Sequence, residues 1–339
     1  MRSPLLEAHN LAVRFRLGRG VVARAVDDVE LSVGRGEIVA LVGESGCGKT
    51  TLARTLLGLE RPSEGTVVFD GSPLRYGSRD LRRYRRRVQL VLQDPTGALN
   101  PRQTVYESVA EGLRIHRTVA RKQREGIETT ETDLVADALA KAGLRPPAGF
   151  FMSYPHELSG GQRQRVVIAG ALALEPEVLV ADEPVSSLDA SIRGEILALL
   201  LRLRDELGLT VLVVTHDLGL AWNIADRIAV MYLGRIVEVG TTEQVLQEAR
   251  HPYTQALLSV VPDIEQIEPV VLAGEPPDPS RVPGGCRFHP RCQALAGGVA
   301  EEAGVADRCT GEPLPVLEGT GEHRAACWLV LEQPLPQRG

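Results

Sequence analysis

Residues 43–50 read Gly-Glu-Ser-Gly-Cys-Gly-Lys-Thr, and this stretch decides the fold of the chain. It has the G-x-x-x-x-G-K-[ST] pattern of a phosphate-binding loop. Its glycines allow the backbone to fold back, so that successive N–H groups point at one anion. Lys49 can reach the β- and γ-phosphates of a nucleotide as a mobile point charge, and the Thr50 hydroxyl can ligate Mg²⁺.

The residues on either side match the strand and the helix that such a loop joins. Glu37–Val42 has the pattern of a buried strand, and Thr51–Leu57 that of the following helix. That helix would aim its positive N-terminal end at the phosphates, which makes a chance match in a glycine-rich turn the weaker interpretation. The nucleotide contacts expected here are Gly43, Glu44, Ser45, Gly46, Cys47, Gly48, Lys49, Thr50 and Thr51.

The composition is that of an ordinary globular protein. Hydrophobic residues make up 43% and charged residues 24% of the 339 residues, a length sufficient for two domains. The net charge of −6 argues against nucleic acid as a partner. No apolar run approaches the length of a membrane span, and the N-terminus lacks the apolar core of a secretion signal. We therefore expect a cytosolic protein that reaches a membrane only through a partner.

The N-terminal residues 5–33 alternate like a β-hairpin that turns at Arg16–Gly20. Phe15 lies near the end of the first strand and could stack on an adenine ring. A buried strand residue is an equally good interpretation of Phe15. Further on, the basic run Arg82–Arg87 favours the solvated face of a short helix over a nucleic-acid patch, because the overall charge is acidic.

Gln93 lies where an apolar strand, beginning at Val88, gives way to polar residues. Ligands of α/β sheets bind at the C-terminal strand edge, so Gln93 could contact Mg²⁺ or the attacking water. Residues 104–145 then have helical spacing, with a polar centre at Gly112–Thr132 that we expect to be mobile. We interpret this region as a helical subdomain inserted into the sheet domain.

A second helix start with glycines follows at residues 154–165. Ser159 is a good N-cap, and Gly160 and Gly161 leave the start of the helix uncovered. The N-terminus of this helix is therefore a second anion site. A plain capped helix is the alternative, but the order Leu-Ser-Gly-Gly-Gln at 158–162 makes it weak.

Two carboxylates close the apolar strand in Glu177–Pro184. Asp182 would hold the Mg²⁺ shell, as in other phosphate-loop nucleotidases. Glu183 points differently and could orient and deprotonate a water molecule. A merely solvated pair does not explain why carboxylates end a wholly apolar strand in a protein that already binds phosphate.

Two more polar positions follow. Ser186–Asp189 forms a turn before a long helix, Ile192–Leu207, and Asp189 could simply cap that helix. Thr210–Thr215 is another buried strand, and His216 follows it directly. A histidine at the end of such a strand, beside a phosphate site, is best interpreted as a γ-phosphate contact.

In their order and spacing, these motifs resemble the ATP-binding subunit of ABC transporters over residues 5–245. The resemblance implies an α/β fold with a phosphate-loop (RecA-like) nucleotidase core, an N-terminal antiparallel β subdomain, an inserted helical subdomain and a small Cys-containing C-terminal extension. The matching motifs are the Walker A loop Gly43–Thr50, the Q-loop residue Gln93, the signature Leu158–Gln162, the Walker B strand Val178–Glu183, the D-loop Ser186–Asp189 and the switch histidine His216.

The resemblance also implies how these residues act. Two ATPases close on two ATP molecules, and each ATP lies between the phosphate loop of one chain and the signature of the other. The signature residues in contact with ATP are then Ser159, Gly160, Gly161 and Gln162. Glu183 is the catalytic base and His216 the γ-phosphate sensor. The residues that hold the phosphates and Mg²⁺ are Lys49, Thr50, Gln93 and Asp182.

A narrower resemblance, to the dipeptide/oligopeptide (and nickel) importer branch, covers nearly the whole chain. It rests on Gln93-Asp-Pro with Leu99–Arg102, and on Tyr154–Gln162, Met231–Arg235 and His251–Leu258. The chain is most similar to the second of the two ATPases of such importers. This implies a heterodimer with a related ATPase, two membrane permeases and an extracytoplasmic substrate-binding protein, and a location at the cytoplasmic face of the membrane.

Two alternative functions retain the ATPase activity and differ in the process that it powers. The cargo could be a nickel chelate or a sugar, because the binding protein and permeases choose it. An ABC ATPase that acts on nucleic acid or ribosomes is weaker, since such proteins usually carry long coiled-coil insertions or two ATPase halves in one chain.

The composition changes after about residue 250, where prolines become frequent. We therefore divide the chain into an ATP-binding domain, residues 1–250, and an extension, residues 251–339. The helical subdomain is placed at about residues 95–175 of the first domain. Four of the five cysteines lie in the extension, at Cys286, Cys292, Cys309 and Cys327.

Four thiols in a short cytosolic segment favour a metal over disulfides. The lack of a C-x-x-C pair weakens a zinc ribbon, and four thiolates are the ligand set of a [4Fe–4S] cluster. The sequence of Pro283–Cys292 resembles the C-terminal segment of the peptide-importer ATPases. For some members of that branch, the resemblance implies an iron–sulfur cluster at this segment. Zinc and unligated thiols remain alternatives, and His289 and His323 are reserve ligands that are more often surface residues.

Cys47 lies inside the phosphate loop. A small residue tolerated at a variable position is the favoured interpretation. The helix N-terminus should nevertheless favour its thiolate, so alkylation of Cys47 is predicted to block ATP binding.

Overall fold

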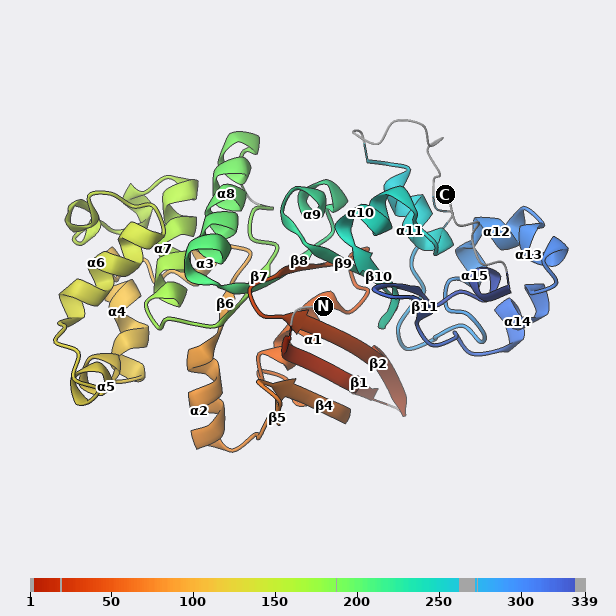
Figure 1. Cartoon of the computed structure of the whole chain (residues 1–339), viewed down its shortest axis with the longest axis horizontal. Helices are drawn as coiled ribbons and strands as arrows, with labels where there is room; N and C mark the ends of the chain where they lie inside the picture. Colours follow the sequence, from red (N-terminus) through yellow and green to blue (C-terminus); the bar gives the residue numbers. More distant parts are fainter. Residues whose placement is uncertain (1–2, 19, 187, 262–271, 273, 333–339) are drawn as a thin grey trace. The chain divides into compact units, whose positions relative to one another are not determined.

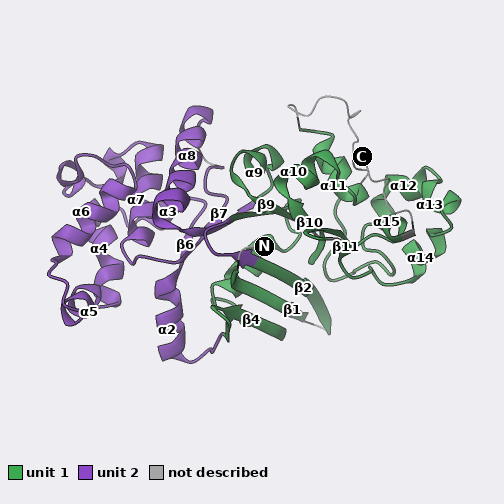
Figure 2. Cartoon of the chain, in the orientation of Figure 1, with its two compact units in different colours: residues 1–32, 38–73, 215–339 green, residues 33–37, 74–214 purple. Residues whose placement is uncertain are grey.

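The chain forms two compact units in the computed structural model, which describes residues 3–18, 20–186, 188–261, 272 and 274–332. Unit 1 consists of residues 1–32, 38–73 and 215–339, and unit 2 of residues 33–37 and 74–214 (Figure 2). Each unit is thus assembled from segments that are distant in sequence. The phosphate loop and the C-terminal extension belong to the same unit.

Unit 1 contains an antiparallel sheet in the order β2-β1-β4-β5 (Figure 1). Its strands are β1 (Pro4–Gly18), β2 (Val21–Gly34), β4 (Glu64–Phe69) and β5 (Ser72–Pro73). The predicted hairpin is confirmed, but the first strand continues through Arg16 and ends only at Gly18. Gly18 and Gly20 have φ angles of 93° and 79°, which glycine adopts without strain, so the chain reverses there.

A second set of strands in unit 1 carries the phosphate loop and stands in the order β11-β12-β10-β9-β3. These strands are β3 (Ile38–Val42), β9 (Arg227–Tyr232), β10 (Arg235–Thr241), β11 (Glu318–Thr320) and β12 (His323–Ala325). β3 is buried along its whole length and runs parallel to β9, whereas β10, β12 and β11 add to the sheet as antiparallel strands. The extension therefore continues the sheet that positions the loop.

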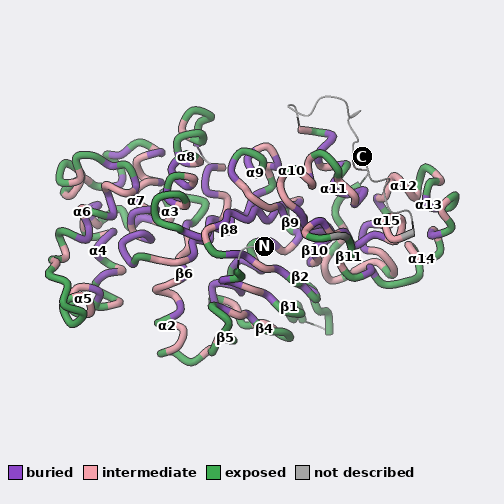
Figure 3. Tube along the Cα trace, in the orientation of Figure 1, coloured by how far each residue is buried: buried purple, intermediate pink, exposed green. Residues whose placement is uncertain are grey.

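Short helices cover the rest of unit 1. They are α1 (Lys49–Leu56), α9 (Leu218–Ile224), α10 (Thr242–Gln247), α11 (Pro252–Leu258), α12 (Gln293–Ala296), α13 (Val299–Glu302), α14 (Ala306–Gly311), α15 (Trp328–Glu332) and the 3₁₀ turn η3 (His289–Arg291). One hydrophobic cluster joins β3 and β9 to α11 and the extension. Tyr232, Tyr253 and Phe288 are each at most 1% exposed and form its aromatic centre (Figure 3 shows the burial along the chain).

Unit 2 is built around three parallel strands in the order β8-β7-β6. They are β6 (Val88–Val91), β7 (Val178–Asp182) and β8 (Thr210–Thr215). β8 is buried throughout and β7 is buried up to Asp182, as the apolar runs predict. Their carboxyl ends lie at one edge of the sheet, because the register pairs Val91 with Ala181 and Asp182 with Val214.

The predicted helices of unit 2 are present as α2 (Ser78–Arg87), α4 (Val105–Ile115), α5 (Thr118–Arg124), α6 (Glu131–Lys141), α7 (Gly160–Leu172) and α8 (Ala190–Leu207). The structure adds the short helix α3 (Pro95–Ala98) and the 3₁₀ turns η1 (Pro147–Phe150) and η2 (Pro155–Glu157), which the sequence did not predict. The basic run Arg82–Arg87, predicted as part of a short helix, forms the C-terminal half of α2. The polar centre that we expected to be mobile is ordered as α5, where Lys122 donates a hydrogen bond to Glu175 at 2.6 Å.

Reciprocal side-chain caps fix where the helices of this region begin. Thr104 caps α4 and Thr130 caps α6, and in both cases the acidic residue three positions on returns the hydrogen bond to the cap. Each such capping box satisfies two N–H groups that a helix start leaves unpaired. The sequence therefore specifies these starts locally, without help from the sheet.

Candidate nucleotide-binding site

The phosphate loop of unit 1 depends on glycine at two positions. Gly43 has a φ of 153°, and a Cβ there would lie 2.2 Å from the carbonyl oxygen of Met231. Gly48 has a φ of 109°, and its Cβ would lie 2.1 Å from the carbonyl oxygen of Ala25. Since real Cβ atoms do not approach oxygen so closely, both positions require glycine. The loop is thereby held directly against the backbones of β2 and β9.

Lys49 is 7% exposed and turns back over its own loop. Its Nζ donates to the carbonyl oxygens of Gly43 at 2.7 Å and Glu44 at 2.9 Å. Lys49 also begins α1, and the N-cap Gly48 supplies no side-chain hydrogen bond to this helix. The positive end of this helix therefore lies beside an ammonium group, which is the arrangement that binds phosphate.

Two further residues of unit 1 support the loop, and the sequence analysis did not identify them. The N–H of Gly234, in the turn between β9 and β10, donates to the carbonyl of Cys47 at 2.8 Å. The hydroxyl of Tyr253, on α11, accepts the N–H of Glu44 at 2.9 Å. Both residues lie in stretches that carry the importer resemblance, but no local pattern indicates their contact with a loop about two hundred residues away.

Cys47 does not behave as the sequence predicted. Its side chain is 4% exposed, and burial raises the pKa of its thiol, which Lys49 only partly offsets. The expectation that the helix N-terminus would favour the thiolate is therefore wrong, because desolvation outweighs the helix dipole and the nearby ammonium. Alkylation of Cys47 is correspondingly disfavoured in the folded protein.

Two other predicted ATP contacts of unit 1 are accessible to a ligand. Phe15 is 37% exposed on β1, so its interpretation as a buried strand residue is wrong. His216 is exposed and directly follows β8. The next residue, Asp217, caps α9 through Leu220 N–H at 3.0 Å, which fixes the turn in which His216 lies.

In unit 2 the two predicted carboxylates stand next to each other at the end of β7, on different backbone conformations. Asp182 is the last residue of the strand, whereas Glu183 has a φ of 49°, in the left-handed region that few residues other than glycine adopt. The N–H of Glu183 donates to the carbonyl of Val214 at 2.8 Å, and its own carbonyl accepts from the N–H of Ser186 at 3.3 Å. These bonds hold the strained backbone of Glu183 directly after the end of the strand.

Gln93 and Asp189 complete the predicted set in this unit. Gln93 is exposed two residues beyond the end of β6, at the sheet edge where Glu183 also leaves β7. Asp189 occupies the N-cap position of α8 but makes no side-chain cap hydrogen bond. The simple capping role considered for Asp189 is therefore wrong in this structure.

The signature segment forms a closed helix start. The Ser159 hydroxyl accepts the N–H of Gln162 at 3.2 Å, and the Gln162 side chain accepts the N–H of Ser159 at 2.9 Å. A Cβ at Gly161 would lie 2.7 Å from Cγ2 of Ile192, on α8. The signature and the helix that follows the D-loop are therefore in tight contact within unit 2.

The four cysteines of the extension lie in one folded region of unit 1. The N–H of Cys286 donates to the carbonyl of Cys309 at 2.9 Å. Burial, with smaller contributions from nearby Cys292 and Cys309, raises the pKa of Cys286 to about 12 and that of Cys327 to about 11. Among the described residues, however, no three or more His, Cys, Asp or Glu side chains are arranged to hold a metal ion.

The two reserve histidines have structural contacts instead. His323 is 1% exposed, and its Nε2 lies 2.8 Å from the buried carboxylate of Glu238, so its interpretation as a surface residue is wrong. His289 has its Nδ1 2.9 Å from the carbonyl of Cys286. Within the described ranges, no helix is long and apolar enough to cross a membrane.

The phosphate loop between β3 and α1 in unit 1 and, separately, the two carboxylates that end β7 in unit 2 are features of an ATPase of the phosphate-loop class. Comparisons with known proteins narrow this class. Residues 26–186 match the ABC transporter family, and residues 237–296 match the oligopeptide/dipeptide transporter C-terminal region. The chain belongs to the family of ABC transporter ATP-binding subunits that carry this C-terminal region, and it is an ATPase.

Individual relatives agree with this assignment. The chain is 39% identical to "Dipeptide transport ATP-binding protein DppF" of Escherichia coli K12, over 100% of this chain and 98% of the relative. It is 44% identical to "Putative oligopeptide transport ATP-binding protein YkfD" of Bacillus subtilis 168, over 86% and 88%. A solved dimer of the ATP-binding cassette MJ0796 bound to ADP and Pi matches with a TM-score of 0.61 at 30% identity, over 70% and 99%. The predicted fold class is thereby confirmed.

Proposed function

We propose that this chain hydrolyses ATP to power the import of di- or oligopeptides, as a dimer with a second, related ATPase subunit. One observation carries the proposal: a single chain holds both halves of an ABC-type ATP site. Unit 1 supplies a phosphate loop, and unit 2 supplies the carboxylates and the signature. The match to the peptide-transporter C-terminal region, and the printed names of the relatives, support peptides as the cargo.

The phosphate loop makes the first contacts with ATP. Lys49 exchanges its bonds to the loop carbonyls for the β- and γ-phosphates, and the N–H groups of the loop hold the remaining phosphate charge. Phe15 stacks on the adenine. Thr50, Gln93 and Asp182 would hold Mg²⁺, which would supply neutralisation of the phosphate charge.

Hydrolysis depends on Glu183 and on a second chain. Glu183, whose backbone is left-handed, orients and deprotonates the attacking water. His216 senses the γ-phosphate. The signature residues of the partner ATPase complete the site, and Ser159, Gly160, Gly161 and Gln162 serve the partner's ATP in the same way, with Asp189 at the dimer contact.

Coupling to transport follows from this arrangement. ATP bridges the two ATPases, so its binding drives their closure, and hydrolysis resets them. The chain acts from the cytoplasmic face of the membrane, bound to two permease subunits that receive cargo from an extracytoplasmic binding protein. A nickel chelate or a sugar in place of the peptide leaves the ATPase steps unchanged.

A variant of Glu183 tests the ATPase part of the proposal. Glu183→Gln should lower ATP hydrolysis by about 10³-fold, the range that a general base contributes, and should trap an ATP-bound dimer on size exclusion. Glu195→Gln is the matched control, since this exposed residue of unit 2 pairs with Arg165. Wild-type turnover in Glu183→Gln would remove Glu183 from catalysis. If the Glu183→Gln chain forms an ATP-bound dimer with MgATP alone, in the absence of a second ATPase, the proposed heterodimer would be wrong and the chain would act as a homodimer.

We also propose that Cys286, Cys292, Cys309 and Cys327 hold a [4Fe–4S] cluster. The donor chemistry fits, because four thiols gather in one region and thiolates are the usual cluster ligands. Bound there, the cluster would cross-link the short helices of the extension. Iron and acid-labile sulfide should be found in anaerobically purified protein and lost in Cys286→Ser. Zinc, or no metal, would overturn the cluster and leave the ATPase assignment intact.

A further inference from the structure

An ion pair joins the C-terminal extension to the phosphate loop. Arg291 is 7% exposed, and its guanidinium donates two hydrogen bonds to the carboxylate of Glu44, at 2.7 and 3.0 Å. Glu44 is the second residue of the phosphate loop, and Arg291 lies between Cys286 and Cys292 in the extension. A two-pronged arginine–carboxylate pair fixes orientation as well as distance.

Tyr253 reinforces the same point of the loop. Its hydroxyl accepts the N–H of Glu44 at 2.9 Å, so both the side chain and the backbone of Glu44 are held. The Tyr253 ring lies 5.3 Å from the ring of Phe288, in the extension, and 4.6 Å from that of Tyr232. Within the extension, Phe288 therefore braces Tyr253, and the extension also binds Glu44 through Arg291.

Glu44 in turn contacts the groups that would receive ATP. Its carbonyl accepts from Lys49 Nζ at 2.9 Å and from the N–H of Cys47 at 3.3 Å. A rotation of Glu44 would therefore move the carbonyl to which the phosphate-binding lysine is bonded. The path from Arg291 to Lys49 passes through one residue.

We propose that Arg291 is a positioning residue for ATP: the C-terminal extension, through Arg291 and Tyr253, holds Glu44 so that the phosphate loop keeps its phosphate-binding conformation. The proposal rests on the role proposed above for the loop in binding ATP. It gives the extension a function within the ATPase cycle of its own chain, separate from any metal that it holds.

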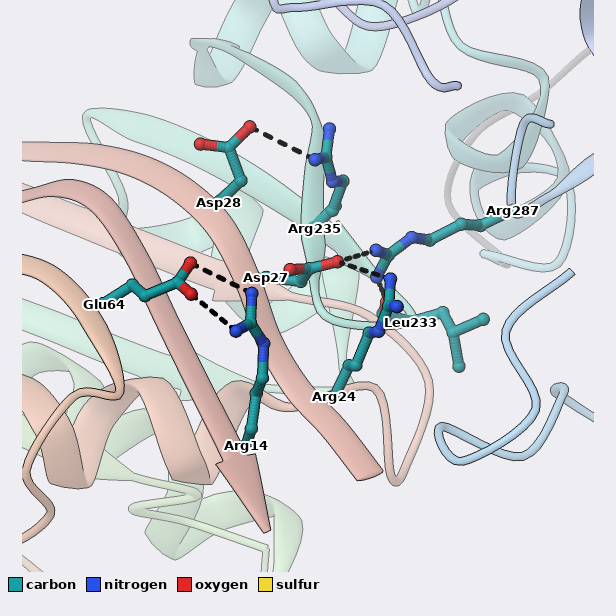
Figure 4. Close-up of polar contacts among 8 residues, drawn as sticks. All are labelled: Arg14, Arg24, Asp27, Asp28, Glu64, Leu233, Arg235 and Arg287. Carbon is teal, nitrogen blue, oxygen red and sulfur yellow. Dashed lines mark hydrogen bonds and ion pairs between the residues drawn. The ribbon is translucent and has the colours of Figure 1, made fainter. Parts of the chain in front are cut away.

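A second arginine of the same segment separates positioning from simple docking. Arg287 is buried and pairs with Asp27 of β2, and it also donates to the carbonyl of Leu233 (Figure 4). This pair attaches the extension to β2, a strand of the antiparallel sheet. If the extension acted only by being attached, loss of Arg287 and loss of Arg291 would have the same effect on ATP.

The test uses the full-length chain and measures the dissociation constant for MgATP together with the thermal unfolding midpoint. Arg291→Gln and Glu44→Gln should each weaken ATP binding by about tenfold, the effect of one charged hydrogen-bonded contact, and the double variant should be no weaker than either single one. Arg291→Lys should recover part of the affinity. Tyr253→Phe removes only the hydroxyl and should weaken binding by about threefold.

Two controls accompany these variants. Arg287→Gln should lower the unfolding midpoint while changing ATP affinity by less than about twofold. Arg14→Gln, which breaks the exposed two-pronged pair with Glu64, should leave ATP affinity unchanged and shift the midpoint little. Wild-type affinity in folded Arg291→Gln and Tyr253→Phe would overturn the proposal, as would an equal loss in Arg287→Gln. Lys49→Ala separates failure of the positioning role from failure of the proposed ATP site. Wild-type ATP binding in the Lys49→Ala variant would mean that the phosphate loop is not the ATP site.

Discussion

The phosphate loop before α1 and the signature before α7 both place glycines at the start of a helix, and they are built in opposite ways. At α1 the cap is Gly48, in a left-handed conformation and without a side-chain cap. At α7 the cap is Ser159, whose hydroxyl closes a reciprocal capping box with Gln162. The first helix start has no side-chain cap, whereas the second satisfies two N–H groups through its capping box.

The difference also extends to what the glycines touch. Gly43 and Gly48 face backbone carbonyl oxygens, which cannot move without moving a strand. Gly160 and Gly161 face the side chains of Leu188 and Ile192, which can shift. We infer that the phosphate loop is a complete anion site within its own unit, and that the signature is a capped, weaker one. This suits a segment that contributes to ATP binding only when another chain presents the nucleotide.

Substitution of Gly48 should have the largest effect of the series. Gly48→Ala places a Cβ 2.1 Å from a carbonyl oxygen at a φ of 109°, so strain and overlap act together. We expect a loss of roughly 3 kcal/mol in the free energy of unfolding and of most ATP affinity. Chemical denaturation and ATP binding measure the two effects.

Gly46→Ala is the control within the same loop. Gly46 has a φ of 79°, but nothing lies within 4 Å of its Cβ position, so only backbone strain of about 1 kcal/mol is expected. Equal losses in the Gly46→Ala and Gly48→Ala variants would mean that contact with β2 does not determine the path of the loop.

The same contrast explains how far the sequence could predict the site. The phosphate loop between β3 and α1, the two carboxylates at the end of β7 and the helix start at Ser159 depend on local patterns, and they lie on the elements that the sequence predicts. Cys47 was misjudged because the pattern shows its helix N-terminus but not its burial. The roles of Arg291 and Tyr253 depend on contacts between distant segments, which no periodicity or spacing encodes.

Gly161→Ala should have the next largest effect. Its Cβ would lie 2.7 Å from Cγ2 of Ile192, so we expect overpacking to cost about 2 kcal/mol of stability. Because the obstacle is a side chain, Gly161→Ala combined with Ile192→Ala should lose less than the sum of the two single losses. Additive losses in a denaturation cycle would show that the two helices do not limit each other here.

Ser159→Ala should have a smaller effect, since it removes only the side-chain half of the capping box. The expected cost is about 1 kcal/mol of unfolding free energy, the usual value of an N-cap. Ser159→Thr keeps a hydroxyl at the same position and should retain most of that stability. A Ser159→Ala protein as stable as wild type would indicate that α7 does not need its cap.

Gly160→Ala should have the smallest effect on stability and a separate effect on function. Its Cβ would lie 3.5 Å from Leu188, an ordinary contact, and alanine favours a helix over glycine, so the stability should rise by at most about 0.5 kcal/mol. If Gly160 approaches the ATP of a partner chain, the added methyl group should displace the nucleotide and lower hydrolysis by about tenfold in the assembled transporter. ATP binding to the isolated chain, which does not use that chain's own signature, should not change. Unaltered hydrolysis would remove Gly160 from the contact in trans, whereas weaker binding to the isolated chain would mean that the two helix starts are not independent.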